Sequence, residues 1–419
     1  MEKNKTMKKR SFTLLLIMFT LFSAAKATDK GFEDYAKHQQ GLLVSAYEKR
    51  DVNAYSKLLD DFLDKYNRLA PADQKVYVPY LIDAYYNFSC TWSLNGNKAM
   101  AINYLEKAIK AGYMDYSHIS EDSDLDNIRN EAAFVSLIKP LRGVGDYLYI
   151  IQKAGAYNSA DNRPLPAFTY QGAENPDLAI LRKTLHLDSI AGTGNEVSKV
   201  INLLYWIHNL VPHDGNHENP TVKNALSMIN QCKKENRGLN CRGLATVLNE
   251  CYLSMGIKSR FVTCLPKDSL HIDNDCHVIN MVYINSLKKW IWIDPTFCAY
   301  VMDDKGGLLS IEEVRERIVD NKPLIINPDA NWNHKNSETK DAYLYHYMAK
   351  NLYRLECGVS SEYDAETRSP GKVVKYVVLL PLEYFKQKPD KIESLNPTGT
   401  SYITYNTNNP DAFWAAPEK

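Results

Sequence analysis

The chain has 419 residues with 50 basic and 50 acidic side chains, and 45% of its residues are hydrophobic. The neutral charge and the lack of a basic cluster beyond the N-terminus exclude a protein that binds nucleic acid through a basic surface. The length is sufficient for about two or three domains. The eight cysteines show no short paired spacing, so a disulfide-rich scaffold is also excluded.

Residues 1–27 have the pattern of a secretory signal peptide. Basic side chains precede an apolar stretch at 12–25, and Ala25-Lys26-Ala27 supplies the small residues that a signal peptidase reads. The apolar stretch is short for a bilayer span, so we predict a cleaved signal, with a retained anchor as the alternative. We expect a periplasmic or extracellular protein cleaved near Ala27. The segment carries a net charge of +5, which leaves about −5 on the remainder of the neutral chain.

Residues 28–150 are predicted to be helical. The stretch "NKAMAINYLEKAIKAGYMD" has apolar residues at helical spacing, and Gly112 is placed to end that helix. The stretch "DSDLDNIRNEAAFVSLI" predicts a second helix, and the two together are similar to a degenerate tetratricopeptide unit. Such units gain stability by stacking, and helices at about 31–65 and 72–95 could be the neighbours. This region is expected to offer a surface for a protein partner.

A segment at 151–177 without hydrophobic periodicity is predicted to be a linker. Residues 178–305 are predicted to form two helices, a third helix that begins at Cys241 and stops at Gly256, and then short strands. The last two strands are joined by "NSLK", which suits a hairpin turn. The three expected strands are "KSRFVTCL", "CHVINMVYI" and "KKWIWID".

Residues 306–419 are expected to be a mixed extension of the preceding domain. Hydrophobic patterning predicts helices in "SIEEVRERIVD" and "KDAYLYHYMAKNLYRLE", and strands in "KVVKYVVLL" and "SYITYN".

Three residues suggest nucleophilic chemistry. Cys241 is placed at a helix start, where the unsatisfied N–H groups and the helix dipole favour a thiolate. His277 opens one strand and Asp294 ends the next, so an antiparallel hairpin brings the two close together. A carboxylate in that position holds an imidazole in the tautomer that a catalytic base requires. A nucleophile, its base and the residue that orients the base are thus expected to meet.

These motifs resemble the transglutaminase-like superfamily, whose core is similar to that of papain-like cysteine peptidases. The matching stretches are "NCRGLATVLNECYLSMGIKSRFV", "CHVINMVYI" and "KWIWIDPTF", within roughly residues 195–300. The resemblance implies that Cys241 is the nucleophile, His277 the general base and acid, and Asp294 the residue that orients the histidine. Val278 to Met281 depart from the Ala-Trp-Asn-Glu sequence usual after the histidine, which puts the shape of the substrate cleft in question.

We therefore expect an α+β protein in which a helical, repeat-like region precedes a papain-like core, with the cysteine-bearing helix packed on an antiparallel sheet. The expected activity is thiol-dependent hydrolysis of peptide or amide bonds through a thioester acyl-enzyme, acting on a protein or peptide substrate. Two alternatives stay open: transamidation of protein glutamine by the same residues, and an inactive module that binds a partner or a glycan.

Other polar clusters have simpler interpretations. "HIDNDCH" places His271, Asp273, Asp275 and His277 on alternate residues, but no paired cysteine or HExxH element accompanies them, so neither a metal nor another cofactor is expected. The three histidines of "IHNLVPHDGNHENP" are expected to form a helix end and a polar loop. Arg260 is expected to be a structural ion-pair partner, and Trp206, Trp290 and Trp292 core residues. Most cysteines are expected to be buried thiols, with one or two disulfides compatible with the count.

Overall fold

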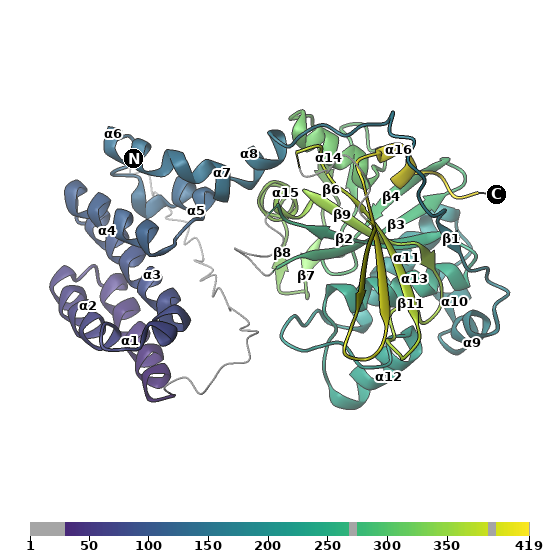
Figure 1. Cartoon of the computed structure of the whole chain (residues 1–419), viewed down its shortest axis with the longest axis horizontal. Coiled ribbons are helices and arrows are strands. Elements are labelled where there is room, and N and C mark those ends of the chain that lie inside the picture. The colour runs from purple at the N-terminus through teal and green to yellow at the C-terminus, as the bar shows by residue number, and fades with distance from the viewer. Residues whose placement is uncertain (1–29, 268–274, 384–390, 419) are drawn as a thin grey trace, which may run out of the picture.

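A computed structural model describes residues 30–267, 275–383 and 391–418 (Figure 1). The predicted signal peptide therefore lies outside the described residues. Among the helices within these ranges, none has the length and hydrophobicity to cross a bilayer. A group of helices lies on one side of the molecule, and the short helices α7 and α8 lead from it to a domain built on a twisted sheet (Figure 1).

The helical region begins with four long helices. Asp51 divides the expected helix at 31–65, because its side chain accepts a hydrogen bond from Ala54 N at 2.9 Å and caps the start of α2. Gly112, at φ 118°, ends α4 as predicted. The four helices are α1 (Lys30–Glu48), α2 (Val52–Tyr66), α3 (Pro71–Leu94) and α4 (Lys98–Ala111).

The second helix of the predicted repeat unit is divided. The stretch forms a short 3₁₀ turn and a separate helix, because the Arg129 guanidinium donates to the carbonyl oxygens of Ile119, Ser120 and Asp122 and holds the chain in a non-helical turn. The elements here are α5 (Tyr116–Glu121), η1 (Ser123–Leu125), α6 (Ala132–Ile138), η2 (Lys139–Leu141), α7 (Arg142–Gly145) and α8 (Tyr147–Gln152).

The next segment contains five helices, the last of which is α13. It begins at Cys241 as predicted, and Gly256 adopts φ 74° just beyond its end. Its residues are almost all buried, since it packs on β2 and β3 and is covered by α11 and α12. The elements are β1 (Thr169–Tyr170), α9 (Pro176–Thr184), α10 (Leu187–Ala191), α11 (Glu196–Leu210), α12 (Ala225–Glu235) and α13 (Cys241–Ser254).

One seven-stranded sheet supports the domain, in the order β12-β13-β11-β9-β2-β3-β4. The three strands expected around the site are present as β2 (Ser259–Leu265), β3 (His277–Ile284) and β4 (Lys289–Ile293). Residues beyond 350 add the other four: β9 (Arg354–Gly358), β11 (Val373–Leu379), β12 (Lys391–Leu395) and β13 (Ser401–Thr407). Neighbouring strands are antiparallel except β11 and β13, which pair in parallel.

The expected helix at 340–356 ends early. Residues 341–348 form a π-helix, η3 (Asp341–Met348), followed by α15 (Ala349–Asn351), and the last three residues of the stretch belong to β9. They leave the helix because β9 pairs with both β2 and β11. The remaining elements are β5 (Val301–Met302), α14 (Ile311–Val319), β6 (Ile325–Ile326), β7 (Asn331–Trp332), β8 (Asn336–Ser337), β10 (Ser360–Ser361) and α16 (Pro410–Phe413).

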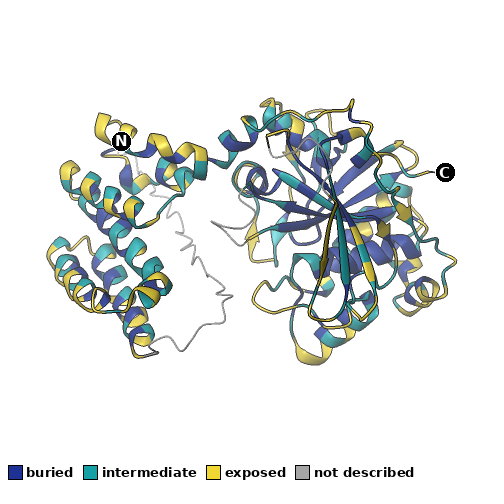
Figure 2. Ribbon diagram, viewed as in Figure 1, coloured by how far each residue is buried: buried dark blue, intermediate teal, exposed yellow. Residues whose placement is uncertain are grey.

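The strands β2, β3 and β4 consist almost entirely of buried residues, whereas β12, at one edge of the sheet, is exposed (Figure 2). Trp290 and Trp292 are core residues as expected, 6% and 0% exposed. Arg260 is structural, but among the described residues no carboxylate pairs with it. Its guanidinium lies 3.6 Å from the ring centre of Phe168 and donates to the Phe413 carbonyl at 2.7 Å. All eight cysteines are free thiols, six of them buried and two, Cys241 and Cys276, intermediate.

Candidate active site

The start of α13 is fixed by two asparagines. Asn240 caps the helix, with its side-chain oxygen accepting from Gly243 N at 3.1 Å. Asn219 donates to that same oxygen at 2.7 Å, and a Cβ on Gly243 would lie 2.6 Å from the Asn219 oxygen, so only glycine permits this approach. Because the N–H groups of a helix start favour negative charge, Cys241 occupies a position that favours a thiolate.

Strands β3 and β4 bring His277 and Asp294 together. Their register pairs Asn280 with Ile293, so Asp294 lies opposite Ile279, two residues along the strand from His277 and on the same face. His277 Nε2 lies 2.7 Å from Asp294 Oδ2, and the two side chains are 1% and 0% exposed. The carboxylate is therefore placed to fix both the tautomer and the orientation of the imidazole.

Both carboxylate oxygens of Asp294 accept hydrogen bonds. Its Oδ1 accepts from Thr296 N at 2.9 Å and from Phe297 N at 3.3 Å. Its Oδ2 accepts from His277 and from the Tyr343 hydroxyl, the latter at 2.5 Å. A buried carboxylate is costly unless hydrogen bonds compensate its desolvation, and here four do so.

The Cys241 thiol interacts with two imidazoles, those of His213 and His277, and its Sγ lies 4.0 Å from the Cys276 carbonyl oxygen. Burial would raise the pKa of this thiol. The hydrogen bonds from both histidines, together with the charge of the imidazoles, outweigh burial and lower the pKa of Cys241 to about 6.

The pKa of His277 shifts in the opposite direction. Burial disfavours its charged form, but the negative charge of Asp294 and the hydrogen bond to it dominate, and the hydrogen bond with Cys241 adds to them. Together they raise the pKa of His277 to about 10. Between these two values the site holds a thiolate and an imidazolium, and the two groups titrate as a coupled pair.

His213 is the residue that sequence reasoning missed, since its stretch predicts only a polar loop. Its backbone pairs with Leu239 in an isolated parallel bridge, two residues before Cys241. The Asn333 side chain accepts from His213 N at 2.7 Å and donates to its carbonyl at 2.8 Å. These contacts join segments far apart in the chain, so no local motif indicates them.

The backbone at Gly238 and Leu239 lies close to the Pro212 carbonyl, just before His213, and this approach depends on the glycine. A Cβ on Gly238 would lie 2.2 Å from the Pro212 carbonyl oxygen, which the Leu239 N–H contacts at 3.1 Å. At Nδ1, the His213 imidazole accepts a hydrogen bond from Trp332 Nε1, with the two nitrogens 3.2 Å apart. In the neutral ring the proton therefore lies on Nε2, the other ring nitrogen.

The other histidines of that stretch do not join the site. His208 is buried, with ring nitrogens 3.1 Å from the Pro295 carbonyl and 3.0 Å from Asn331 Oδ1, so it supports the turn after Asp294. His217 is exposed and pairs with Asp214 at 2.6 Å. They end a helix and line a polar loop, in line with the expectation from the sequence.

The residues weighed as metal ligands are used otherwise or lie outside the described ranges. Asp275 lies 3.1 Å from Lys350 Nζ, and His277 pairs with Asp294. His271 and Asp273 fall within the stretch 268–274 that the structure does not describe. Among the described residues, no three histidine, cysteine, aspartate or glutamate side chains gather as metal ligands.

Aromatic rings enclose the His277 imidazole. Phe297 and Tyr347 meet it edge to face, with ring centres 5.5 and 5.3 Å away. These contacts restrict rotation of the imidazole and shield it from water.

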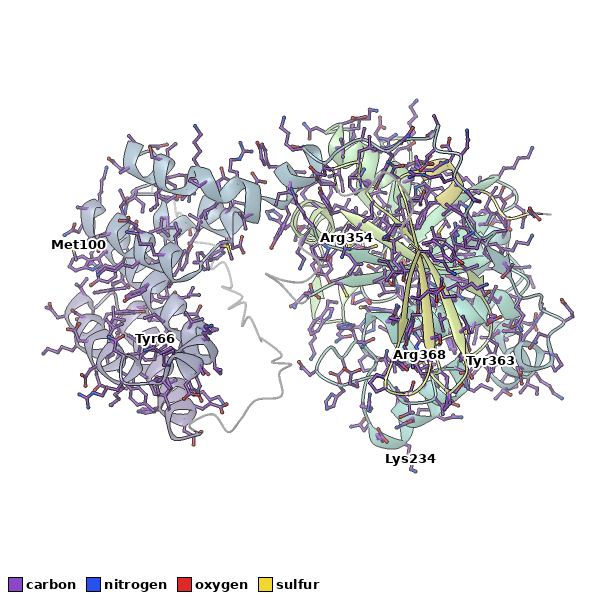
Figure 3. All side chains as sticks on the ribbon, in the orientation of Figure 1. Tyr66, Met100, Lys234, Arg354, Tyr363 and Arg368 are labelled. Atoms are coloured by element: carbon purple, nitrogen blue, oxygen red, sulfur yellow. The ribbon has the colours of Figure 1, made fainter. Side chains whose placement is uncertain are left out.

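A buried charged cluster lies next to the nucleophile. The Arg242 guanidinium lies 3.4 Å from Glu366 and about as far from the Thr263 hydroxyl. Glu366 also pairs with Arg368, which is labelled in Figure 3, at 3.4 Å. The positive charges keep the pKa of Glu366 below its usual value despite burial. This cluster anchors the first turn of α13.

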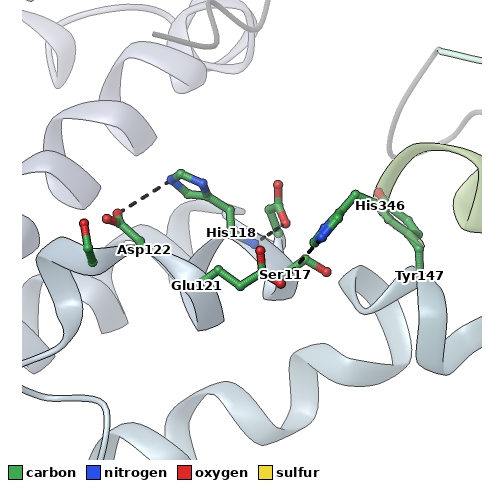
Figure 4. Close-up of a pocket in the computed structure, with 8 residues that line it drawn as sticks. Ser117, His118, Glu121, Asp122, Tyr147 and His346 are labelled. Carbon is green, nitrogen blue, oxygen red and sulfur yellow. Dashed lines mark hydrogen bonds and ion pairs between the residues drawn. The ribbon is translucent and has the colours of Figure 1, made fainter. Parts of the chain in front are cut away.

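A separate pocket of about 420 Å³ lies where the helical region meets η3 (Figure 4). Two weak ion pairs cross or border it, His118 with Asp122 at 3.7 Å and His346 with Glu121 at 3.6 Å. The eight lining residues include no cysteine, so the pocket lacks the nucleophile that the α13 site contains.

Comparison with known proteins relates part of the chain to a known superfamily. The model of the transglutaminase-like superfamily matches residues 183–295, a stretch that ends just after Asp294. No curated protein matches the chain. Among solved structures, the chain is similar to a protein of Cytophaga hutchinsonii described as a "putative cysteine protease", at 21% identity and a TM-score of 0.23. That similarity covers 36% of this chain and 46% of the other, less than half of its length.

The expected fold class is confirmed: the chain is an α+β protein with an N-terminal helical region and a sheet-based domain. Residues 183–295 are a transglutaminase-like superfamily domain.

Proposed function

We propose that the protein is an exported thiol hydrolase that cleaves peptide or amide bonds with Cys241 as nucleophile. The observation that carries the proposal is the meeting of three groups: a thiol at a helix start, an imidazole that bonds it, and a buried carboxylate 2.7 Å from that imidazole. This is the arrangement that an activated nucleophile requires. Export is proposed from the signal-like pattern of residues 1–27.

In the proposed reaction, the Cys241 thiolate attacks the carbonyl carbon of the substrate and a tetrahedral intermediate forms. His277, protonated in the resting pair, gives its proton to the leaving amine as the carbon–nitrogen bond breaks. The product is a thioester on Cys241. His277, now neutral, takes a proton from the incoming water, and hydrolysis of the thioester restores the thiolate–imidazolium pair. Asp294 holds the imidazole throughout.

Two donors would stabilise the oxyanion. The backbone N–H of Cys241 is the first of α13 and has no acceptor within the helix. The second is Nε2–H of His213, which faces the reacting sulfur because Trp332 occupies the other ring nitrogen. Donors placed where charge develops contribute strongly to acyl transfer. His213 cannot serve as the base, since its acceptor nitrogen is already bonded.

The direct test incubates wild type and Cys241→Ala with a peptide library and a primary amine, and reads the products by mass spectrometry. Cleavage by wild type alone supports hydrolysis. Incorporation of the amine without cleavage would replace hydrolysis by transamidation, and identical products from both proteins would support the inactive binding module.

The matched control is Cys276→Ala. Cys276 adjoins the site and is also half-buried, but burial and the nearby Cys241 raise the pKa of its thiol to about 12. Its substitution should leave cleavage intact. Loss of cleavage in this variant and not in Cys241→Ala would overturn the choice of nucleophile.

A further inference from the structure

Tyr343 contacts the site from outside the transglutaminase-like domain. It lies in η3, beyond residue 295, and its side chain is 1% exposed. Its hydroxyl donates at 2.5 Å to Asp294 Oδ2, the same oxygen that accepts from His277. We propose that Tyr343 is a positioning residue that acts on Cys241 through Asp294 and His277, an inference that rests on the proposed function of the site.

The direction of the Tyr343 hydroxyl bond is fixed by a second contact. Trp292 Nε1 donates to the Tyr343 oxygen at 3.1 Å. An indole N–H can only donate, so the tyrosine oxygen is the acceptor there and its own proton is directed toward Asp294. Trp292, which donates to the Tyr343 hydroxyl, is fully buried in β4 two residues before Asp294, which accepts from it. Both partners of the hydroxyl are therefore held by β4 and the residue that follows it.

One segment, η3, reaches two members of the site. Tyr343 and Tyr347 lie four residues apart in this helix, so their side chains lie on nearly the same side of it. The first bonds Asp294, and the ring of the second meets His277 with centres 5.3 Å apart.

The tyrosine bond should matter because Asp294 is an anion in a fully buried place. Removal of one of its four donors leaves more of its negative charge uncompensated. A site with excess negative charge holds its protons more tightly, so the thiolate of Cys241 would form at higher pH. The imidazole would also lose part of the constraint on its orientation.

Tyr343→Phe tests this with two measurements. We expect the pH midpoint of Cys241 alkylation by iodoacetamide to rise by about one unit, and peptide cleavage to fall about 10- to 100-fold in kcat with KM unchanged. These are the effects of losing a hydrogen bond to a charged group. The control is Tyr252→Phe: Tyr252 is equally buried, but its hydroxyl donates to the Val200 carbonyl at 2.9 Å. It should leave both measurements unchanged.

A double variant separates positioning from a general loss of stability. If Tyr343 acts through Asp294, Tyr343→Phe should add little to the effect of Asp294→Asn, because residues acting as a unit are not additive. Additive effects, or a Tyr343→Phe alkylation profile equal to wild type in a folded protein, would overturn the inference. Alkylation needs no substrate, so absence of peptide cleavage by wild type would contradict the proposed function and leave the test of Tyr343 intact.

Discussion

The transglutaminase-like domain and the segment that follows it contribute differently to one site. Residues 183–295 supply all the groups proposed to react: Cys241, His277, Asp294 and His213. The segment beyond residue 295 supplies what holds them, namely Tyr343 on Asp294 and Trp332 on His213. The family motif therefore ends before the site is complete.

The residues that react and the residues that hold them in position thus come from different parts of the chain. Cys241, His277 and Asp294 are placed by a helix start, strand alternation and hairpin register, all of which are local, whereas His213 is placed by contacts with distant segments. Their supports come from side chains more than about 40 residues further along the chain, and they act by fixing protons and rings. Substitutions in the first set should lower activity by about 10²- to 10⁴-fold. Those in the second set should lower it by about 2- to 100-fold.

His277→Gln should have the largest effect after loss of the cysteine itself. The variant removes the proton donor and the positive partner of the thiolate, so peptide cleavage should fall by about 10⁴-fold, the upper range for general acid–base catalysis. His217→Gln, at an exposed ring bonded to Asp214, is the control and should keep full activity. Cleavage by His277→Gln within tenfold of wild type would contradict its role.

Asp294→Asn should come next. The amide can favour the wrong imidazole tautomer and weakens the thiolate–imidazolium pair. A serine triad loses about 10⁴ in turnover on this change, and a partly ionised cysteine pair should lose less, roughly 10²- to 10³-fold. Turnover and alkylation rate at pH 6 are the measurements, with circular dichroism to check the fold. Values within a factor of about two of wild type would refute the triad assignment.

His213→Ala and Trp332→Phe test how much His213, and its hydrogen bond from Trp332, contribute to activity. Loss of one oxyanion donor should lower kcat by about 10²-fold. Trp332→Phe keeps the histidine but frees its tautomer, so we expect a loss of about 2- to 10-fold, the contribution of one neutral hydrogen bond. Nitrogen-15 chemical shifts of His213 should show the Nε2–H form in wild type and a mixture in Trp332→Phe. Equal losses in the two variants would contradict this order.

Glu121→Gln should have the smallest effect. The carboxylate of Glu121 is 66% exposed and lies 3.6 Å from His346, which belongs to η3. Exposed ion pairs contribute at most about 1 kcal/mol, so thermal unfolding and peptide cleavage should change little. A loss of cleavage above about fivefold would show instead that the helical region controls the site.

Much of the domain follows from local pattern. The strands β2, β3 and β4 and the bounds of α13 are predictable from hydrophobic patterning and a terminating Gly256, and these suffice to bring Cys241, His277 and Asp294 near one another. Asp294 lies opposite Ile279 rather than His277, so it contacts His277 diagonally across the hairpin, an arrangement that the predicted hairpin allows.

The contacts that hold His213 and Asp294 in position could not be predicted from local sequence patterns. His213 is fixed by Leu239, Trp332 and Asn333, and Tyr343 meets Asp294 only after the chain has completed several further elements. The divided helix at Arg129 and the parallel pairing of β11 with β13 likewise depend on tertiary contacts that override local periodicity.

The central claim is that Cys241 is a thiolate paired with His277 near neutral pH. Alkylation of wild type by iodoacetamide across pH 4 to 10, followed cysteine by cysteine with mass spectrometry, tests it without any substrate. The pKa of Cys241, lowered to about 6, predicts a reactivity midpoint near pH 6, while Cys276, with its pKa raised to about 12, stays unreactive throughout. A Cys241 midpoint near 9, the value of an ordinary thiol, would contradict the account.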